Sequence, residues 1–415
     1  MLPFHAILPA LNEMVPISSA FVGDEIVKCT SGNLFKTTFG GAPFAICAAG
    51  RSGFMAFSSD FKVTVKYLEA PVQVEVPALS NGISCKVIAT TTSMTLTAVA
   101  LLTGSTYFPT STTRQLKTAE ILKMEPSSCK CKSKPRPCVI FHGIGGTHEL
   151  EDLQDTPKDV TRMGNINDNA PCCSEVKYAI LNTLNSSWLD KSLQHKFCDR
   201  ALRVSETSDK EKHVVKDTVV VTHSMAGLVL SLAIATGKCS LGKGTSWVAI
   251  STPMMGSMVS DFAHDYCDKK DHAFSPGKML EFIGQCPLPA SRRNIVYQNE
   301  RHASKTINEA YVKAQKAYAK NVFAAMCSDN PNGVMSQYEA IMLFTARVVP
   351  HKSPQNDALV EFQSCAIGLD ESKFGKNYRS KFYKPSLNHA DTAFLTHDAL
   401  WDDSQKPRKW FECLL

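Results

Sequence analysis

Residues 218–237 read TVVVTHSMAGLVLSLAIATG, and the rest of the chain is organised around this stretch. Its first five residues, 218–222, are β-branched, which is typical of a buried parallel strand. Small residues surround Ser224, and an apolar run that suits a helix then stops at Gly237. A serine at a sharp turn from strand to helix has an exposed Oγ, and N–H groups at the helix start can face an anion beside it. The stretch therefore predicts a nucleophilic Ser224.

The flanks of this serine depart from the usual pattern for such a turn. That pattern is Gly-x-Ser-x-Gly, and here Thr222 and Ala226 occupy the glycine positions. Glycine suits both positions because neighbouring backbone crowds the turn. A β-branched residue such as Thr222 could push the turn out of its strained shape. An ordinary strand, loop and helix with an incidental serine is the alternative interpretation.

Composition places the chain among ordinary globular proteins. Its 415 residues can bury a large core, and they are 44% hydrophobic and 20% charged. The formal net charge is only +6, and Lys and Arg are scattered along the chain. The charge therefore gives no indication of a nucleic-acid partner.

Cysteine is abundant, with fifteen residues in the chain. Three lie before residue 100 and twelve after it. The nearest approach to metal spacing is Cys129 and Cys131, without a paired CxxC set or a histidine cluster. Disulfides explain the count better, and they require an oxidising compartment. Twelve cysteines allow six bridges but do not reveal the pairing, and neither a metal nor a cofactor is predicted.

The first third of the chain divides into three stretches. Residues 1–93 form an N-terminal extension with alternating segments at 61–67 and 72–76, which suggest a small β unit. Residues 94–106 begin with Met94 and continue as a short apolar run with small residues, which resembles the core of a secretory signal peptide. The alternative is that this run is a buried element of a genuine N-terminal domain. Residues 107–135 are rich in Thr, Ser, Lys and Pro and predict a linker.

A second motif precedes the serine. A short apolar strand over residues 137–141 runs into His142-Gly143-Ile144-Gly145-Gly146. A strand ending in this loop and followed later by His-Ser-Met resembles the lipases and esterases of the α/β-hydrolase superfamily. The resemblance implies an α/β-hydrolase fold over residues 136–415, with a mostly parallel, doubly wound sheet. It also implies an oxyanion hole made by the backbone N–H groups of Ile144 and Met225.

The same resemblance indicates a general base and its orienting acid. In this superfamily the order along the chain is Ser, acid, His. Asp357 lies in a segment that resembles the lipase pattern around the acid, with Ala358 in place of a glycine. His389 lies in Leu387-Asn388-His389-Ala390-Asp391, which resembles the Asn-His-x-Asp of several lipases. His397 and Asp391 are the main competitors for the two roles.

Two further segments carry expectations about structure. Residues 258–340 form an insertion relative to a minimal hydrolase, which predicts a helical cap over the active site with a helix at about 302–325. A structural decoration is the equally weighted alternative. Residues 174–188 have apolar positions at a helical spacing, which predicts a helix there.

Together these features predict a secreted serine hydrolase that cleaves carboxylic esters through Ser224, His389 and Asp357. The expected substrate is an ester or a lipid, and a transient contact with a lipid surface is compatible with this function. A thioesterase or acyltransferase with the same three residues is one alternative. A noncatalytic protein of this fold that binds a ligand is the other, because many members of common folds have lost their chemistry. The sequence does not indicate an oligomeric state.

Overall fold

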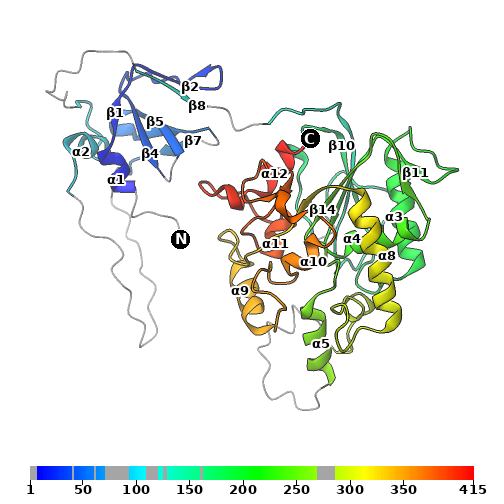
Figure 1. The fold of residues 1–415 in the computed structure, drawn as a ribbon. Coiled ribbons are helices and arrows are strands. Elements are labelled where there is room, and N and C mark those ends of the chain that lie inside the picture. The colour runs from blue at the N-terminus through cyan, green and yellow to red at the C-terminus, as the bar shows by residue number, and fades with distance from the viewer. Residues whose placement is uncertain are drawn as a thin grey trace. The chain divides into compact units, whose positions relative to one another are not determined.

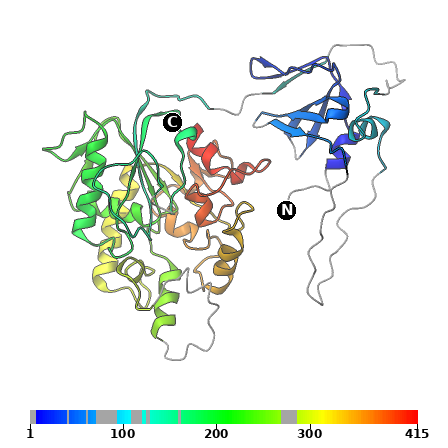
Figure 2. The same cartoon turned by 180° about the vertical axis from the view of Figure 1, so that it is seen from behind.

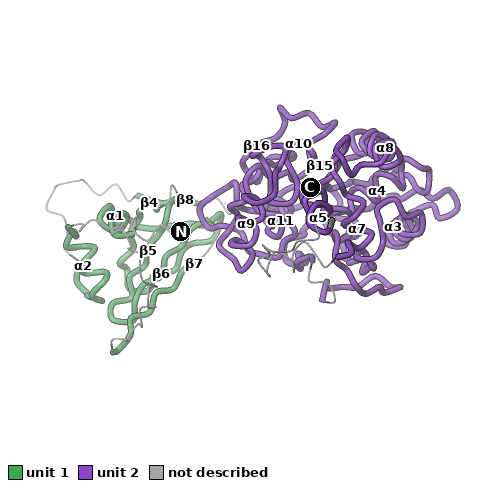
Figure 3. Tube along the Cα trace, turned by 90° about the horizontal axis from the view of Figure 1, so that it is seen from below, with its two compact units in different colours: residues 1–128 green, residues 129–415 purple. Residues whose placement is uncertain are grey.

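A computed structural model describes residues 7–39, 42–59, 62–70, 93–108, 120–124, 129–158, 162–268 and 286–415. The chain divides into two compact units, residues 1–128 and residues 129–415 (Figure 3). The division falls inside the stretch 107–135 that composition predicts to be a linker. Part of that stretch, β8 (Ile121–Met124), is a strand of the N-terminal unit. None of the described helices is long and apolar enough to cross a membrane.

The N-terminal unit is built mainly from strands. In its described residues, an antiparallel sheet has the order β1 (Val15–Pro16), β4 (Leu34–Phe39), β5 (Ala42–Ala48), β6 (Phe54–Phe57) and β7 (Lys62–Val65). A smaller sheet orders β3 (Glu25–Ile26), β2 (Ser19–Val22) and β8. A disulfide joins Cys29 to Cys47, and β7 lies where the sequence predicts a strand over 61–67. The second predicted strand, over 72–76, lies outside the described residues.

The signal-like segment forms a helix of this unit. Helix α2 (Leu96–Leu102) buries Ala98 and Leu101, and the Tyr67 hydroxyl donates a hydrogen bond to the Leu101 carbonyl. Near α1 (Ile7–Asn12), the Asn12 side chain accepts from the Thr95 N–H at 2.8 Å. The segment therefore packs with residues that precede it in the chain. A role in export stays a prediction, which sequencing of the mature N-terminus would test.

The C-terminal unit is organised around a parallel sheet. Within the described residues its strand order is β10 (Cys173–Ala179), β9 (Arg136–Phe141), β12 (Val219–His223), β14 (Ser246–Ile250), β15 (Val322–Met326), β17 (Phe382–Tyr383) and β16 (Phe374–Gly375). All neighbouring pairs run parallel. The order reverses at β9, because the chain passes to β10 on one side and then returns to β12 on the other. Such a reversal opens a crevice at the carboxyl ends of the two strands.

Alternating side chains bury both faces of this sheet. In β9, Val139 and Phe141 pack in one core and Cys138 and Ile140 in the other. The first core is covered by α3 (Lys191–Val204), α4 (Met225–Ala235) and α8 (Lys305–Asn321). The second core is covered by α12 (Pro407–Cys413) and nearby segments. The green helices α3 and α4 and the yellow helix α8 accordingly lie on the opposite side of the sheet from the red helix α12 (Figures 1 and 2).

The predicted helix over residues 174–188 is wrong. Most of its first half is β10, which pairs with β9. The register shifts between Cys173 and Val176, so the exposed and buried positions do not alternate cleanly at the start of the strand. This irregularity removes the period of two that would have marked a strand in the sequence.

The range predicted to be a cap insertion, 258–340, is only partly outside the main fold. Helix α8 packs against α4, and β15 is a central strand of the sheet. Among the described residues of the unit, the remaining helices are α5 (Met258–Asp268), α7 (Ala290–Arg293), α9 (Glu339–Val348), α10 (Phe362–Ala366) and α11 (His389–Thr392). The short strands β11 (Val214–Val215) and β13 (Ser240–Leu241) pair with each other, outside the main sheet. Single 3-10 turns lie at Gly50–Ser52 in the N-terminal unit and at Asn167–Asn169, Glu371–Lys373 and Asp403–Gln405 in the C-terminal unit.

All twelve cysteines after residue 100 are described, and they form six disulfides. The pairs are Cys129–Cys413, Cys131–Cys172, Cys138–Cys173, Cys198–Cys239, Cys267–Cys286 and Cys327–Cys365. The expected disulfides are thus present, with a pairing that the sequence did not reveal. Disulfides persist in oxidising surroundings, so this pattern is compatible with an extracellular location.

Candidate functional site

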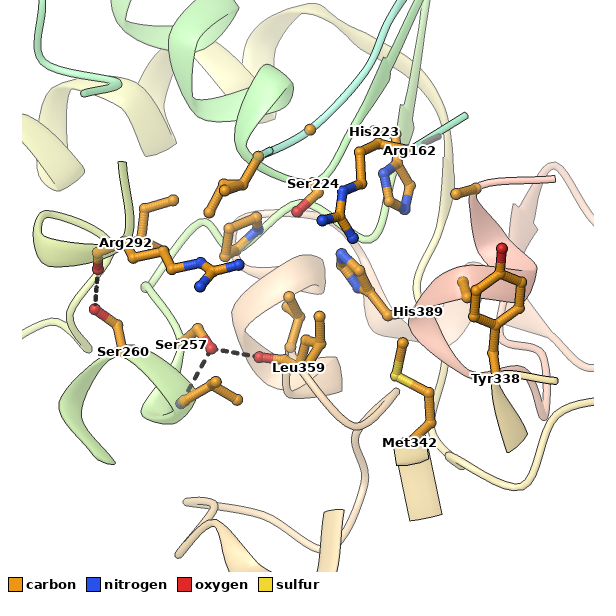
Figure 4. Close-up of a pocket in the computed structure, with 18 of the residues that line it drawn as sticks. Arg162, His223, Ser224, Ser257, Ser260, Arg292, Tyr338, Met342, Leu359 and His389 are labelled. Carbon is orange, nitrogen blue, oxygen red and sulfur yellow. Dashed lines mark hydrogen bonds between the residues drawn. The ribbon is translucent and has the colours of Figure 1, made fainter. Parts of the chain in front are cut away.

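A cavity of about 220 Å³ opens at the carboxyl ends of β9 and β12. Its wall includes the loop after β9, the start of α4, and residues from the segments around α5, α7, α9 and α11. Ser224 and His389 both line it, and Figure 4 shows their side chains on the same side of the cavity. Most of the other lining side chains are apolar, including Ile144, Ile295 and Leu359.

Ser224 occupies a strained turn between β12 and α4. Its backbone has φ 57° and ψ −131°, a region that residues other than glycine rarely adopt. The strained turn is held from both sides, because the Ser224 N–H donates to the Ile250 carbonyl at 2.8 Å and the Gly227 N–H donates to the Ser224 carbonyl at 3.0 Å. The side chain thus sits at the strand end, where the sequence places it.

The unusual flanks of the serine have local explanations. The Thr222 hydroxyl accepts a hydrogen bond from the Trp247 indole N–H at 2.8 Å, so it has a role inside the sheet. The crowded position is Gly227, where an added Cβ would lie 2.3 Å from Thr252 Oγ1. The glycine that the turn requires is therefore one residue further along than in the usual pattern, and Ala226 is accommodated.

The loop after β9 runs directly against the serine. A Cβ added at Gly143 would lie 2.7 Å from Ser224 Cβ, so only glycine fits there. The Thr183 hydroxyl donates to the Gly143 carbonyl at 2.7 Å and accepts from the Gly146 N–H at 3.0 Å. Thr183 thereby ties together both ends of the Gly143–Gly146 segment, which contains Ile144.

His142 also holds this loop in place, through two hydrogen bonds of its ring. Its Nδ1–H donates to the Gly143 carbonyl at 2.9 Å, and its Nε2 accepts from the Leu181 N–H at 3.2 Å. This pattern requires the neutral imidazole. Burial lowers the pKa of His142 to about 4, and the positive charge of Arg162 contributes in the same direction. His142 is therefore a structural support rather than a proton carrier.

Acid is expected to destabilise the protein through His142. The folded-state pKa of about 4 lies below the ordinary value of 6.5, so the unfolded chain takes up this proton first as pH falls. The free energy of unfolding should drop between about pH 6.5 and pH 4, by on the order of 3 kcal/mol from this group. Urea unfolding of the parent and of His142→Gln at pH 7 and pH 4.5 would measure it. An equally steep fall in the variant would contradict the assignment.

Asp357 and His389 are joined by a short hydrogen bond. His389 Nδ1 lies 2.8 Å from Asp357 Oδ2, and both side chains are buried. The other carboxylate oxygen, Oδ1, accepts the N–H groups of Leu359 at 3.0 Å and Val360 at 2.8 Å. The His389 N–H also donates to the Asp357 carbonyl at 2.9 Å. Asp357 thus holds the His389 imidazole in place through both its side chain and its backbone carbonyl.

The two competitors named from the sequence are placed differently. Asp391 accepts the Val334 and Asn388 N–H groups at 3.1 Å each and the Thr396 hydroxyl at 2.8 Å. It caps α11 and ties a neighbouring loop to it, while burial raises its pKa to about 6. His397 is exposed and is not part of the cavity wall.

His223 is a buried neighbour of the pair. Its ring centroid lies 4.7 Å from that of His389, and its Nε2 lies 3.3 Å from the Thr392 hydroxyl. Burial, followed by the charge of His389, holds the pKa of His223 well below its usual value. A neutral His223 places no second positive charge beside His389 when that residue takes up a proton.

Ala358, the third departure from the lipase pattern, adopts the conformation that favours glycine. Its φ is 82°, and it is fully buried next to Asp357. The Asn356 side chain accepts the Ala358 N–H at 2.9 Å, which supports the turn. The turn that presents Asp357 therefore forms without glycine, at the expense of local backbone strain.

Sequence patterns missed two residues of the cavity wall, Arg162 and Arg292. Arg162 precedes the 3-10 turn at Asn167–Asn169, and Arg292 belongs to the short helix α7. Neither lies in a motif, and their meeting at one cavity depends on how distant segments pack. No signal in the sequence could have paired them.

Comparisons with known proteins give weak likenesses. No family model matches the chain, and no curated protein matches it. The mature lipase BlEst2 of Bacillus licheniformis has a TM-score of 0.39 at 12% identity, over 63% of this chain and 87% of that one. The Staphylococcus hyicus lipase has a TM-score of 0.34 at 15% identity, over 68% and 93%. Lipase 1 of Pelosinus fermentans has a TM-score of 0.33 at 13% identity, over 68% and 97%. At these values, any functional conclusion must rest on the geometry of the site.

Proposed function

We propose that the chain is a serine hydrolase of the α/β-hydrolase type that cleaves carboxylic esters. The observation that carries this proposal is that His389, which forms a 2.8 Å hydrogen bond with Asp357, lines the same cavity as the strained Ser224. A nucleophile on a strained turn, a histidine and a carboxylate that orients it are the parts that acyl transfer requires.

Each of the three side chains has its own role in the reaction. Ser224 Oγ attacks the ester carbonyl while His389 Nε2 accepts the hydroxyl proton, and the C–O bond to the alcohol then breaks as His389 returns that proton to the leaving oxygen. Water attacks the acyl-enzyme in the same way, which releases the acid and frees the serine. Asp357 keeps Nδ1 protonated and stabilises the imidazolium that forms in each step.

Two backbone N–H groups are proposed to stabilise the oxyanion. Met225 is the first residue of α4, and the N-terminus of a helix favours negative charge. Ile144 follows Gly143, whose backbone lies against the Ser224 side chain. Donors fixed before the reaction lower the barrier because they need no reorganisation as charge develops.

The cavity wall and the disulfides support three further parts of the proposal, which are the acyl-chain site, the cap and export. Apolar side chains on the cavity wall, such as Met342 and Leu395, suit the acyl chain of an ester. Helices α5 and α7 are the proposed cap, since Ala263 and Arg292 from them line the cavity. Export is proposed from the disulfides, which form in oxidising compartments.

A fluorophosphonate probe would test this proposal. The full chain, made in an oxidising host, should form a covalent adduct that peptide mass spectrometry locates on Ser224. Ser224→Ala should form no adduct, while the exposed Ser240→Ala should react like the parent. A correctly folded parent that forms no adduct would refute the proposal and favour a noncatalytic binding role.

A further inference from the structure

Two arginine side chains project into the largely apolar cavity beside Ser224. Figure 4 shows the guanidinium groups of Arg162 and Arg292 directed into the cavity from different parts of its wall. No Asp or Glu is among the described residues that line the cavity. The cavity therefore combines a largely apolar wall with two positive charges.

Each arginine contacts neighbouring parts of the unit, Arg162 through its side chain and Arg292 through its backbone. The Arg162 side chain lies against the loop after β9, since a Cβ at Gly145 would be 2.7 Å from Arg162 Nε. The backbone of Arg292 is anchored because its carbonyl accepts the Ser260 hydroxyl. The preceding Ser291 hydroxyl donates to the Leu184 carbonyl at 2.6 Å. The exposed Arg162 and the partly buried Arg292 thus bring two positive charges to one cavity wall.

Within the described part of the chain, neither guanidinium forms an ion pair or donates a hydrogen bond. Burial, together with the neighbouring charge of Arg162, lowers the pKa of Arg292 to about 10. Arg292 therefore remains charged at neutral pH, and the two like charges repel each other. An anion between them would relieve this repulsion and supply the missing acceptors.

We infer that the site takes esters that carry an anionic group, a carboxylate or a phosphate, close to the ester that is cleaved. This inference rests on the proposed function. A guanidinium presents paired N–H donors that match the oxygens of either anion, and the apolar wall accommodates the hydrocarbon part. The anionic group binds at Arg162 and Arg292 and so positions the ester carbonyl at Ser224.

Matched substrates would test the inference on the full chain. On the acyl side, 4-nitrophenyl hemiadipate, with its free carboxylate, is compared with its methyl ester, which differs mainly in charge. On the alcohol side, monomeric dihexanoyl phosphatidic acid is compared with dihexanoylglycerol. The proteins are the parent, Arg162→Gln, Arg292→Gln and the control Arg293→Gln, which changes the exposed neighbour outside the cavity wall.

In the parent, kcat/KM should be higher for the anionic member of at least one substrate pair, and the pair that shows this identifies the carboxylate or the phosphate. Arg292→Gln and Arg162→Gln should each lower that value by about tenfold to a hundredfold, as expected for the loss of a charge-assisted hydrogen bond. The neutral partner should change by less than about threefold, a small effect on this scale. Arg293→Gln should leave both values near those of the parent.

The contrary outcomes separate the two proposals. An equal loss on charged and neutral substrates would overturn the inference, because the arginines would then support the fold or the chemical step. A parent that prefers the neutral member of both pairs would also overturn it, while leaving ester hydrolysis intact. A folded parent that cleaves none of the four substrates and resists the fluorophosphonate would overturn the proposed function and the inference with it.

Discussion

His389→Ala is expected to lower kcat for a neutral ester by about four to six orders of magnitude. Without the imidazole, the Ser224 hydroxyl has no base to accept its proton and is a weak nucleophile. The loss should appear in kcat more than in KM, because the imidazole acts in the chemical step and not in holding the ester. Initial rates with 4-nitrophenyl butyrate and the rate of fluorophosphonate labelling would both measure it.

His397 provides the matched control for this change. It lies near His389 in the sequence but is exposed and outside the cavity wall. His397→Ala should therefore keep kcat within about threefold of the parent, as is usual for surface changes. If His397→Ala were the inactive variant and His389→Ala the active one, the assignment of the base would be wrong.

The local part of the site could be predicted from the sequence because local patterns encode it. The β-branched run before Ser224 and the apolar run after it match β12 and α4, so the turn between them could be placed to the residue. Periodicity failed where a strand is irregular, as in β10, and it did not recognise β15 as a central strand. Such errors arise because pairing with distant strands decides the outcome there.

The non-local part of the site depends on contacts that no pattern describes. Asp357 and His389 are 32 positions apart, and only resemblance to lipase segments proposed them as a pair. The shift of the required glycine to Gly227 follows from the packing of Thr252, which lies just after the next strand, β14. Arg162 and Arg292 reach one cavity from segments far apart in the sequence, so their shared environment emerges only from the folded chain.

Asp357→Asn is expected to lower kcat by about ten-thousandfold while the fold remains intact. In the parent, Oδ1 of Asp357 accepts two backbone N–H groups, from Leu359 and Val360. The amide oxygen of an asparagine must keep this position, because its NH₂ group would otherwise face two donors. The NH₂ group is then directed at His389 Nδ1, which must become an acceptor. The imidazole proton consequently moves to Nε2, the atom that has to accept the proton of Ser224.

Three measurements would separate this tautomer effect from a loss of structure. Near-ultraviolet circular dichroism and the melting temperature should stay close to those of the parent, because the backbone bond from the His389 N–H to the Asp357 carbonyl does not involve the changed group. Nitrogen NMR of the imidazole should show the proton on Nε2. Asp370→Asn, a change at an exposed carboxylate, should leave kcat unaltered. A loss smaller than about tenfold in Asp357→Asn would mean that another carboxylate, such as Asp391, orients the histidine.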